Sequence, residues 1–395
     1  MADTIPLAGP LQTRIGYDSA ATVSSVPWTI WCMLAGIVSG TVGGLWDISW
    51  HMTIGRDTFW TPAHIAIQMT GVLVGIACGY MILSTTFGGE AAQSTSVKIW
   101  GFRGPFGAFI AVWGCLAMLT SAPLDNWWHN AYGLDVKIVS PPHTLLSLGS
   151  FAIKLGMMAL LASMMNRSTE QVRRRLIWLL LFVGAVCVGQ LGLILTQSTW
   201  PANMHSASCY LAVAIFIPAV LIAPAWASRW RWGCTTVAAI YTAILLAFEW
   251  ILPLFPAVPK LGPVYQHITH FVPLRFPMLL IVPAIVLDLF WRKKDNWGRW
   301  KLAAVTGPLF IVSFLAVQWP FANFLMSPAA RNPIFGMAYF AYFDPATFLY
   351  DPYQFQLAEN TRAQFWLVMA MALVASVIMS RLGFAWGDWM RRMRR

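Results

Sequence analysis

Long apolar stretches separated by short polar segments dominate the chain. A helix needs about 20 mostly apolar residues to cross a bilayer, and ten segments are of about that length. They cover approximately residues 27–48, 62–84, 105–123, 142–164, 175–196, 207–227, 235–255, 274–291, 302–321 and 363–383. Each is too uniformly apolar for a barrel strand, in which apolar and polar residues alternate. The pattern predicts an all-α fold, a polytopic membrane helical bundle of about ten transmembrane helices.

Composition agrees with this pattern. Of the 395 residues 58% are hydrophobic and only 10% are charged, whereas an ordinary soluble domain has about 25% charged residues. A soluble enzyme and a disordered chain are both excluded, because so much apolar surface requires a lipid environment. We expect a multi-pass protein of the cell inner (plasma) membrane.

The basic residues orient the predicted spans. With an even number of spans and both termini in the cytoplasm, 19 of the 26 Lys and Arg residues lie on the cytoplasmic side. The net charge of +11 is therefore a topology signal, and it does not indicate nucleic-acid binding because the charges are spread over short loops. All seven histidines fall at the outer ends of spans or in outer loops. The periplasmic or extracellular side is therefore the predicted place of the chemistry.

Two predicted outer hairpins carry the same polar pattern. Each has an Asp followed four residues later by a His, then Gly-x-Asp, then a hydroxyl residue, Pro, any residue and His. The pattern predicts a duplicated helix hairpin. Residues four apart share one helix face, and Thr-Pro or Ser-Pro begins the next helix with a hydroxyl at the N-cap. The residues are Asp47, His51 and His64 in the first hairpin and Asp125, His129 and His143 in the second.

Each hairpin brings together two imidazoles and one carboxylate. Such a set has three ligands and open positions, which suits copper, iron or zinc better than a hard cation such as calcium. The alternative is that these side chains only cap helices and form hydrogen bonds with their neighbours. Ionisable groups at a membrane boundary are costly unless they are paired or bound to metal, which favours the metal-binding interpretation.

These motifs resemble those of the C subunit of the membrane copper monooxygenases, the enzymes that oxidise methane, ammonia and short alkanes. One family motif is Asp-x3-His-x12-His, which matches Asp47, His51 and His64. The other is Asn-x3-His-x13-His, which matches His129 and His143, with Asp125 in place of Asn. The resemblance covers roughly residues 30–165.

The resemblance implies copper, or else zinc or iron, at up to two sites, and a component of a copper-dependent membrane monooxygenase. It also implies a small apolar substrate, dioxygen, and other monooxygenase-type subunits or a separate electron donor, because the chain has no cupredoxin-like domain. The added negative charge of Asp125 could favour another metal or oxidation state at the second site. The alternative function is metal binding with transport or delivery, and a third is a structural subunit that binds no metal.

The predicted organisation has three parts. Residues 1–26 form a cytoplasmic N-terminal segment, residues 27–165 a four-helix metal-binding module, and residues 175–395 a six-helix C-terminal membrane module with a long outer loop at 322–362. Weaker candidates lie outside the two triads. They are His205, His267 and His270, the hairpin residues Asp57 and Asp135, and Lys154 within a span with Glu249 as a possible partner.

Overall fold

The computed structural model describes residues 22–55, 58–133, 140–198, 204–260, 268–292, 297–336 and 361–394. Nine helices in this part of the chain are long and apolar enough to cross a membrane. They are α1 (Trp28–Thr53), α2 (Pro62–Thr86), α4 (Phe106–Tyr132), α5 (Pro141–Met165), α6 (Glu170–Ser198), α7 (Ala207–Ser228), α8 (Gly233–Ile251), α10 (Arg299–Met326) and α11 (Arg362–Arg392). The all-α membrane bundle expected from the apolar pattern is confirmed at this level.

Shorter elements connect the long helices. They are α3 (Glu90–Gln93), the antiparallel strands β1 (Val97–Ile99) and β2 (Phe102–Gly104), α9 (Ile281–Trp291), and the 3-10 turns η2 (Leu252–Leu254), η3 (Pro328–Ala330) and η4 (Pro333–Phe335). The β1–β2 turn uses two positive-φ residues, Trp100 at 51° and Gly101 at 89°. This conformation suits the twist of a two-residue hairpin.

The helices of the two hairpins extend beyond the predicted spans. α1 continues to Thr53, and α4 continues through Pro123 to Tyr132. A glycine with positive φ follows the end of each helix, Gly55 at 76° and Gly133 at 88°. Glycine is the residue that takes this conformation without strain, which explains the glycine shared by the two hairpins. The Asp and the first His of each motif therefore lie on the last turns of a helix.

The eighth predicted span, 274–291, is not a full transmembrane helix. Only α9, with 11 residues, is helical, and residues 268–280 are not helical. Pro273 and Pro277 interrupt this segment. Proline lacks the N–H that a helix needs and disfavours helical backbone in the residue before it. The expectation of ten transmembrane helices is corrected to nine long helices and one broken segment within the described residues.

Side chains of the long helices satisfy the backbone of this broken segment. Ser49 Oγ donates to Val272 O at 2.6 Å, and Val272 N donates to Thr53 Oγ1 at 2.8 Å. Met278 N donates to the Tyr241 hydroxyl at 3.1 Å. Backbone polar groups without such partners would be very costly at membrane depth. Non-helical backbone is tolerated here because it is enclosed by protein.

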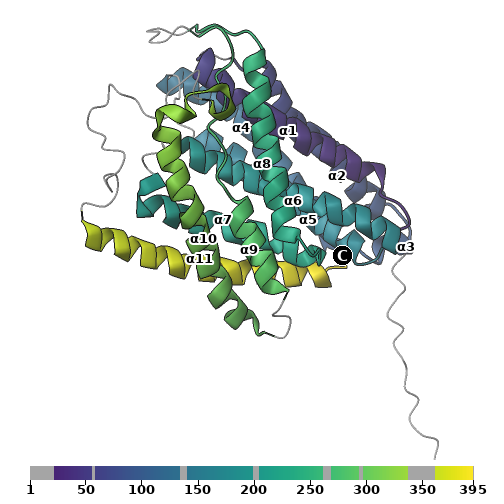
Figure 1. Ribbon diagram of the computed structural model, residues 1–395. Helices are drawn as coiled ribbons and strands as arrows, with labels where there is room; N and C mark the ends of the chain where they lie inside the picture. Colours follow the sequence, from purple (N-terminus) through teal and green to yellow (C-terminus); the bar gives the residue numbers. More distant parts are fainter. Residues whose placement is uncertain are drawn as a thin grey trace, which may run out of the picture.

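The broken segment still passes from one end of the bundle to the other. Its start packs with Ile54, just after α1, and with Leu252, just after α8. Asp288, near its end, accepts hydrogen bonds from the backbone at the start of α8, including Thr235 N at 2.8 Å. Figure 1 shows α9 beside α8 and α10, with these three helices running steeply across α11.

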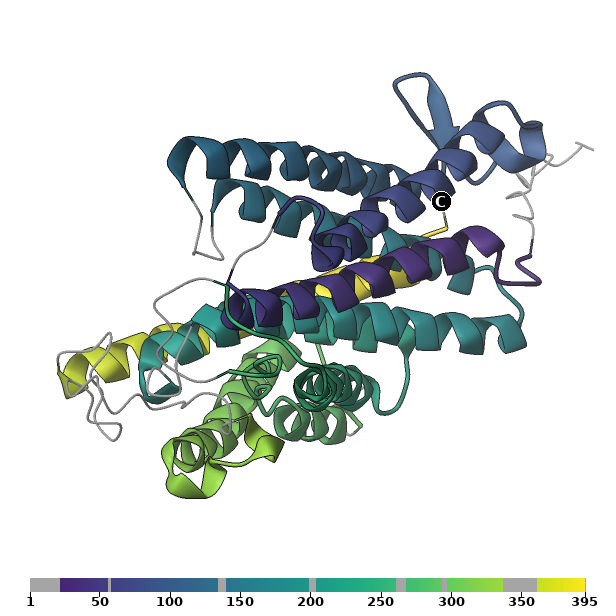
Figure 2. The same cartoon turned by 90° about the horizontal axis from the view of Figure 1, so that it is seen from above.

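Close backbone contacts hold the first helices together. α1 packs on α2, and α4 lies side by side with α5 (Figure 2). A Cβ atom added to Gly114 of α4 would lie 2.6 Å from Gly149 O of α5, and one added to Gly149 would lie 2.7 Å from Gly114 O. Small residues of this kind let transmembrane helices approach closely. The two helices of the second hairpin are therefore in close backbone contact between their ends.

Both described ends of the chain lie beside the α5–α6 turn. Val23 N donates to Arg167 O at 3.0 Å, and Asn166 Nδ2 donates to Met390 O at 2.8 Å. The two ends therefore share one end of the bundle. The side of the membrane that this end faces, the duplication and the division into modules 27–165 and 175–395 stay predictions.

Candidate metal centre

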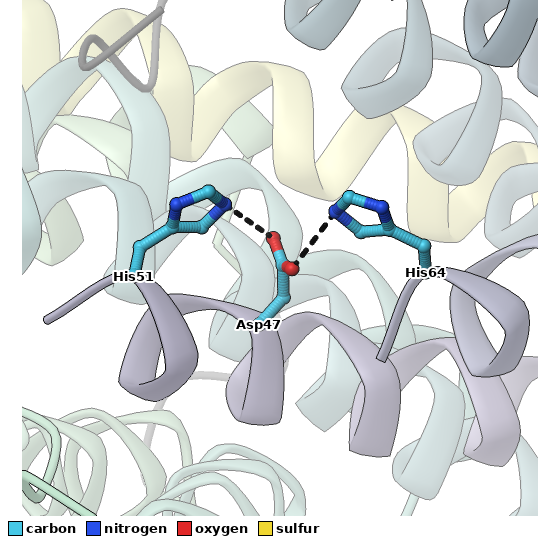
Figure 3. A group of neighbouring side chains, drawn as sticks. All are labelled: Asp47, His51 and His64. Atoms are coloured by element: carbon cyan, nitrogen blue, oxygen red, sulfur yellow. Dashed lines mark ion pairs between the residues drawn. The ribbon is translucent and has the colours of Figure 1, made fainter. Parts of the chain in front are cut away.

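The first triad forms a compact cluster at the hairpin between α1 and α2. Asp47 Oδ1 lies 3.1 Å from His64 Nε2, and Asp47 Oδ2 lies 3.7 Å from His51 Nε2. Figure 3 shows both rings directed at the carboxylate, which lies between them. One donor atom from each residue lies within 4.8 Å of the other two. The sequence spacing predicted that these three side chains meet, and they do so in the structure.

The orientation of His64 directs its Nε2 atom toward Asp47. Its Nδ1 lies 2.9 Å from Thr58 O, and a carbonyl oxygen only accepts, so Nδ1 carries the hydrogen. Nε2 of a neutral ring is then an acceptor that faces the carboxylate oxygen of Asp47. Asp47 Oδ1 is buried and has no hydrogen-bond partner among the described residues. Two facing acceptors need a proton or a metal ion between them. A histidine that binds a metal commonly donates its other N–H to a carbonyl oxygen, as His64 does to Thr58 O.

The second triad repeats the arrangement at the hairpin between α4 and α5. Asp125 lies between its two histidines, with Oδ2 3.4 Å from His129 Nε2 and Oδ1 3.5 Å from His143 Nε2. His129 Nδ1 lies 3.4 Å from Gly133 O, so it too presents Nε2 to the carboxylate. Asp125 Oδ1 is buried without a hydrogen-bond partner in the described part of the chain.

The second triad fits a metal ion less closely than the first. Among the described residues, the first triad alone has all three donor atoms within 4.8 Å of one another. Ligand atoms around a tetrahedral ion with bonds of about 2.1 Å are about 3.4 Å apart, and the distances from Asp125 to each histidine agree with that value. The imidazoles of His129 and His143 would have to move closer to each other before all three donor atoms could bind one ion.

The predicted helix starts differ in detail. Pro62 and Pro141 each occupy the first turn of their helix, as expected. Ser140 Oγ accepts from His143 N at 3.3 Å and caps α5. Thr61 Oγ1 does not cap α2. It accepts instead from Thr58 N at 2.9 Å, within the turn whose carbonyl orients His64.

One cavity of about 530 Å³ connects the two triads. Its wall includes Asp47 and His51 from the first triad and His129 and His143 from the second. Side chains from α1, α2, α4, α5, α6 and α8 complete the wall, and most of them are apolar. The six triad residues therefore share one end of the bundle. The spacing alone did not reveal that both triads face the same space.

Lys154 lies at the inner part of this cavity. It is 5% exposed, and its Nζ donates to Ser150 Oγ at 2.6 Å and to Gln190 Oε1 at 2.7 Å. Glu249, the partner considered from the sequence, is not that partner, and its two carboxylate oxygens have no hydrogen-bond partner among the described residues. Gln190 and Ser150 had no distinguishing signal in the sequence, because single neutral polar residues are common in spans.

The weaker histidine candidates do not join the triads. His205 Nε2 is hydrogen-bonded to Asn323 Oδ1 of α10, and His270 Nδ1 lies 2.9 Å from Thr269 Oγ1. Asp57, Asp135 and His267 lie outside the described residues.

No protein-family model, no curated protein and no solved structure has a significant match to this chain. The resemblance to copper monooxygenases consequently stands on the two motifs alone.

Proposed function

We propose that this protein is a metal-dependent membrane oxidoreductase of the copper monooxygenase type. One observation carries the proposal: two Asp-His-His clusters, built on separate helix hairpins, face one largely apolar cavity. The arrangement provides metal ligands and room for an apolar molecule in the same space. Small binding sites generally combine apolar walls with a few polar groups of this kind.

The residues of the chain have three tasks in this proposal. The triads hold up to two copper ions, with zinc or iron as the alternative metals. Bound copper would supply the one-electron chemistry that activates dioxygen. The apolar wall receives a small apolar substrate from the lipid and excludes water. One oxygen atom of dioxygen enters a C–H bond and the other leaves as water, while a partner subunit or separate electron donor supplies two electrons and two protons are taken up.

Metal transport is less well supported by the contents of the cavity. A transported metal ion would need further ligands along its path beyond the triads. Lys154 follows His143 by eleven residues of helix, about 16 Å along the axis, and places an ammonium group at the inner part of the cavity. A cation at that depth repels a metal ion. The same group is compatible with a cavity that ends inside the bundle.

Metal analysis combined with a turnover assay tests the proposal. The purified chain should bind copper, and His51→Ala and His129→Ala should each lose one site, while the control His270→Ala should lose none. Supplied with a quinol, the copper-loaded protein together with its native membrane partners should convert a short alkane into its alcohol with oxygen from labelled dioxygen. Absence of bound metal in the wild type would refute the proposal, and metal without any oxidation product would favour transport or delivery.

A further inference from the structure

A second cavity, of about 400 Å³, lies at the opposite end of the bundle from the triads. It is formed where α7 and α9 end and α8 and α10 begin, beside the C-terminal part of α11. Five arginines line it, namely Arg229, Arg231, Arg292, Arg299 and Arg391. In the sequence analysis these arginines served only to predict which ends of the spans face the cytoplasm. The structure gathers them around one space.

The positive charge of this cavity is only partly compensated. Asp388 accepts from Arg299 Nε at 2.7 Å and also pairs with Arg391 at 3.7 Å. Asp288 also lines the cavity, but its oxygens accept from Thr235 N at 2.8 Å and Thr235 Oγ1 at 2.7 Å, so they serve the start of α8. Among the described residues, these five arginines and two aspartates sum to three net positive charges.

Two guanidinium groups lie over tryptophan rings, and some of their N–H groups have no hydrogen-bond partner among the described residues. Arg292 Cζ lies 3.7 Å from the centre of the Trp232 ring, and Arg391 Cζ lies 4.4 Å from that of Trp226. Arg292 Nε and Nη2 and Arg391 Nε are buried and have no hydrogen-bond partner among the described residues. Buried donors of this strength normally have acceptors. A planar group with two neighbouring N–H donors matches a phosphate in particular.

The backbone at Arg229 is also unusual. Arg229 follows the last residue of α7 with φ of 56°, in the left-handed region. Glycine is the usual residue at this position, because a side chain is strained there. An arginine therefore occupies a position that favours glycine, and its side chain lines the cavity. Strain of this kind is commonly retained at functional positions.

We propose that this cavity binds the phosphate groups of an anionic phospholipid from the leaflet that surrounds it. Basic pockets between transmembrane helices are suited to such headgroups. Trp230, which is 43% exposed, and Trp226 line the cavity, and tryptophan is the residue that favours the headgroup level. Three net positive charges suit a lipid with two phosphodiesters, such as cardiolipin. This site is independent of the metal triads and of the proposed oxidation.

Lipid titration of the full chain tests the site. Delipidated protein in detergent is titrated with cardiolipin, phosphatidylcholine or inorganic phosphate, and binding is measured by native mass spectrometry and by the shift in melting temperature. Cardiolipin should bind saturably and raise the melting temperature, whereas phosphatidylcholine should not. Arg292→Gln should weaken cardiolipin binding about fivefold or more, since one basic residue near a lipid headgroup contributes about that factor.

Arg229→Gly separates ligand binding from folding. Glycine relieves the left-handed strain, so the lipid-free variant should melt no lower than the wild type, while its cardiolipin affinity falls. The control is Arg174→Gln, because Arg174 is 77% exposed, pairs with Glu170 and does not line the cavity. This variant should bind cardiolipin like the wild type. Equal stabilisation by phosphatidylcholine, unchanged affinity in both cavity variants, or equally tight binding of inorganic phosphate would overturn the lipid assignment.

Discussion

Gly43 lies on α1 one helical turn before Asp47, at a point where α1 meets the backbone of α2. A Cβ atom added there would lie 2.6 Å from Ile67 N and 2.8 Å from Ala63 O, the residue before His64. Gly43→Ala should therefore push the two helices of the first hairpin apart beside the metal ligands. Gly44→Ala is the matched control, because a Cβ atom at the next residue meets nothing within 4 Å.

The size of the effect follows from these contacts. Ordinary van der Waals contact begins at 3.4 Å, so the distance of 2.6 Å between the added Cβ atom and Ile67 N must increase by 0.8 Å. Overpacking of this kind costs about 1–3 kcal/mol of folding free energy. Ligand positions in a metal site tolerate errors of only about 0.2 Å. The metal affinity of the first site should therefore fall by at least about 10–100-fold, the loss typical when residues that orient the ligands are disturbed. Gly44→Ala should be neutral or stabilising by about 0.5–1 kcal/mol, because alanine favours helix.

The assay counts copper per chain at limiting copper concentration. It is run in the His143→Ala background, so that only the first site contributes. Gly43→Ala should then bind little copper and melt at a lower temperature, whereas Gly44→Ala should keep both properties. Full copper binding by Gly43→Ala, with an unchanged melting temperature, would show that the contact between α1 and α2 does not position the first triad.

Three further changes test other parts of the structure. Asp125→Asn should keep a metal at the second site but raise its reduction potential, because a full negative charge is replaced by a dipole; an unchanged midpoint in a redox titration would mean that Asp125 is not a ligand. Thr53→Val should destabilise the protein by about 1–3 kcal/mol by leaving the buried Val272 N without an acceptor, and an unchanged melting temperature would contradict the account of the broken segment. Asp288→Asn should weaken the cap of α8 by about 1 kcal/mol and tighten cardiolipin binding by adding a net positive charge, so weaker binding by a folded variant would count against the charge argument.

The apolar pattern was sufficient to locate the long helices. Spans such as 62–84 and 142–164 match α2 and α5 closely, because an apolar segment that faces lipid must satisfy its backbone hydrogen bonds within itself. The Asp-x3-His spacing was equally informative, since residues four apart share a helix face. The Pro-x-His spacing placed the second histidine of each triad in the first turn of the returning helix. Local geometry thus determined both triads.

The contacts between helices that are distant in the sequence could not be predicted from local patterns. Pro273 and Pro277 interrupt the predicted helix and leave an enclosed non-helical segment. The cost of burying its backbone polar groups is offset because Ser49, Thr53 and Tyr241 form hydrogen bonds with them. Similarly, Lys154 donates a hydrogen bond to the neutral amide of Gln190 rather than to a carboxylate. Hydropathy counts apolar residues along the chain and contains no information about partners that other helices supply.

The sequence was enough to locate the nine long helices and the residues of the two Asp-His-His triads. Only the packed fold shows that both triads face one cavity and that Arg229, Arg292 and Arg391 surround another. The physical reason is the range of the interactions involved. Helix formation and capping depend on residues within a few turns, whereas a cavity is bounded by residues far apart in the chain. Its charge and its lining exist only after the helices have packed.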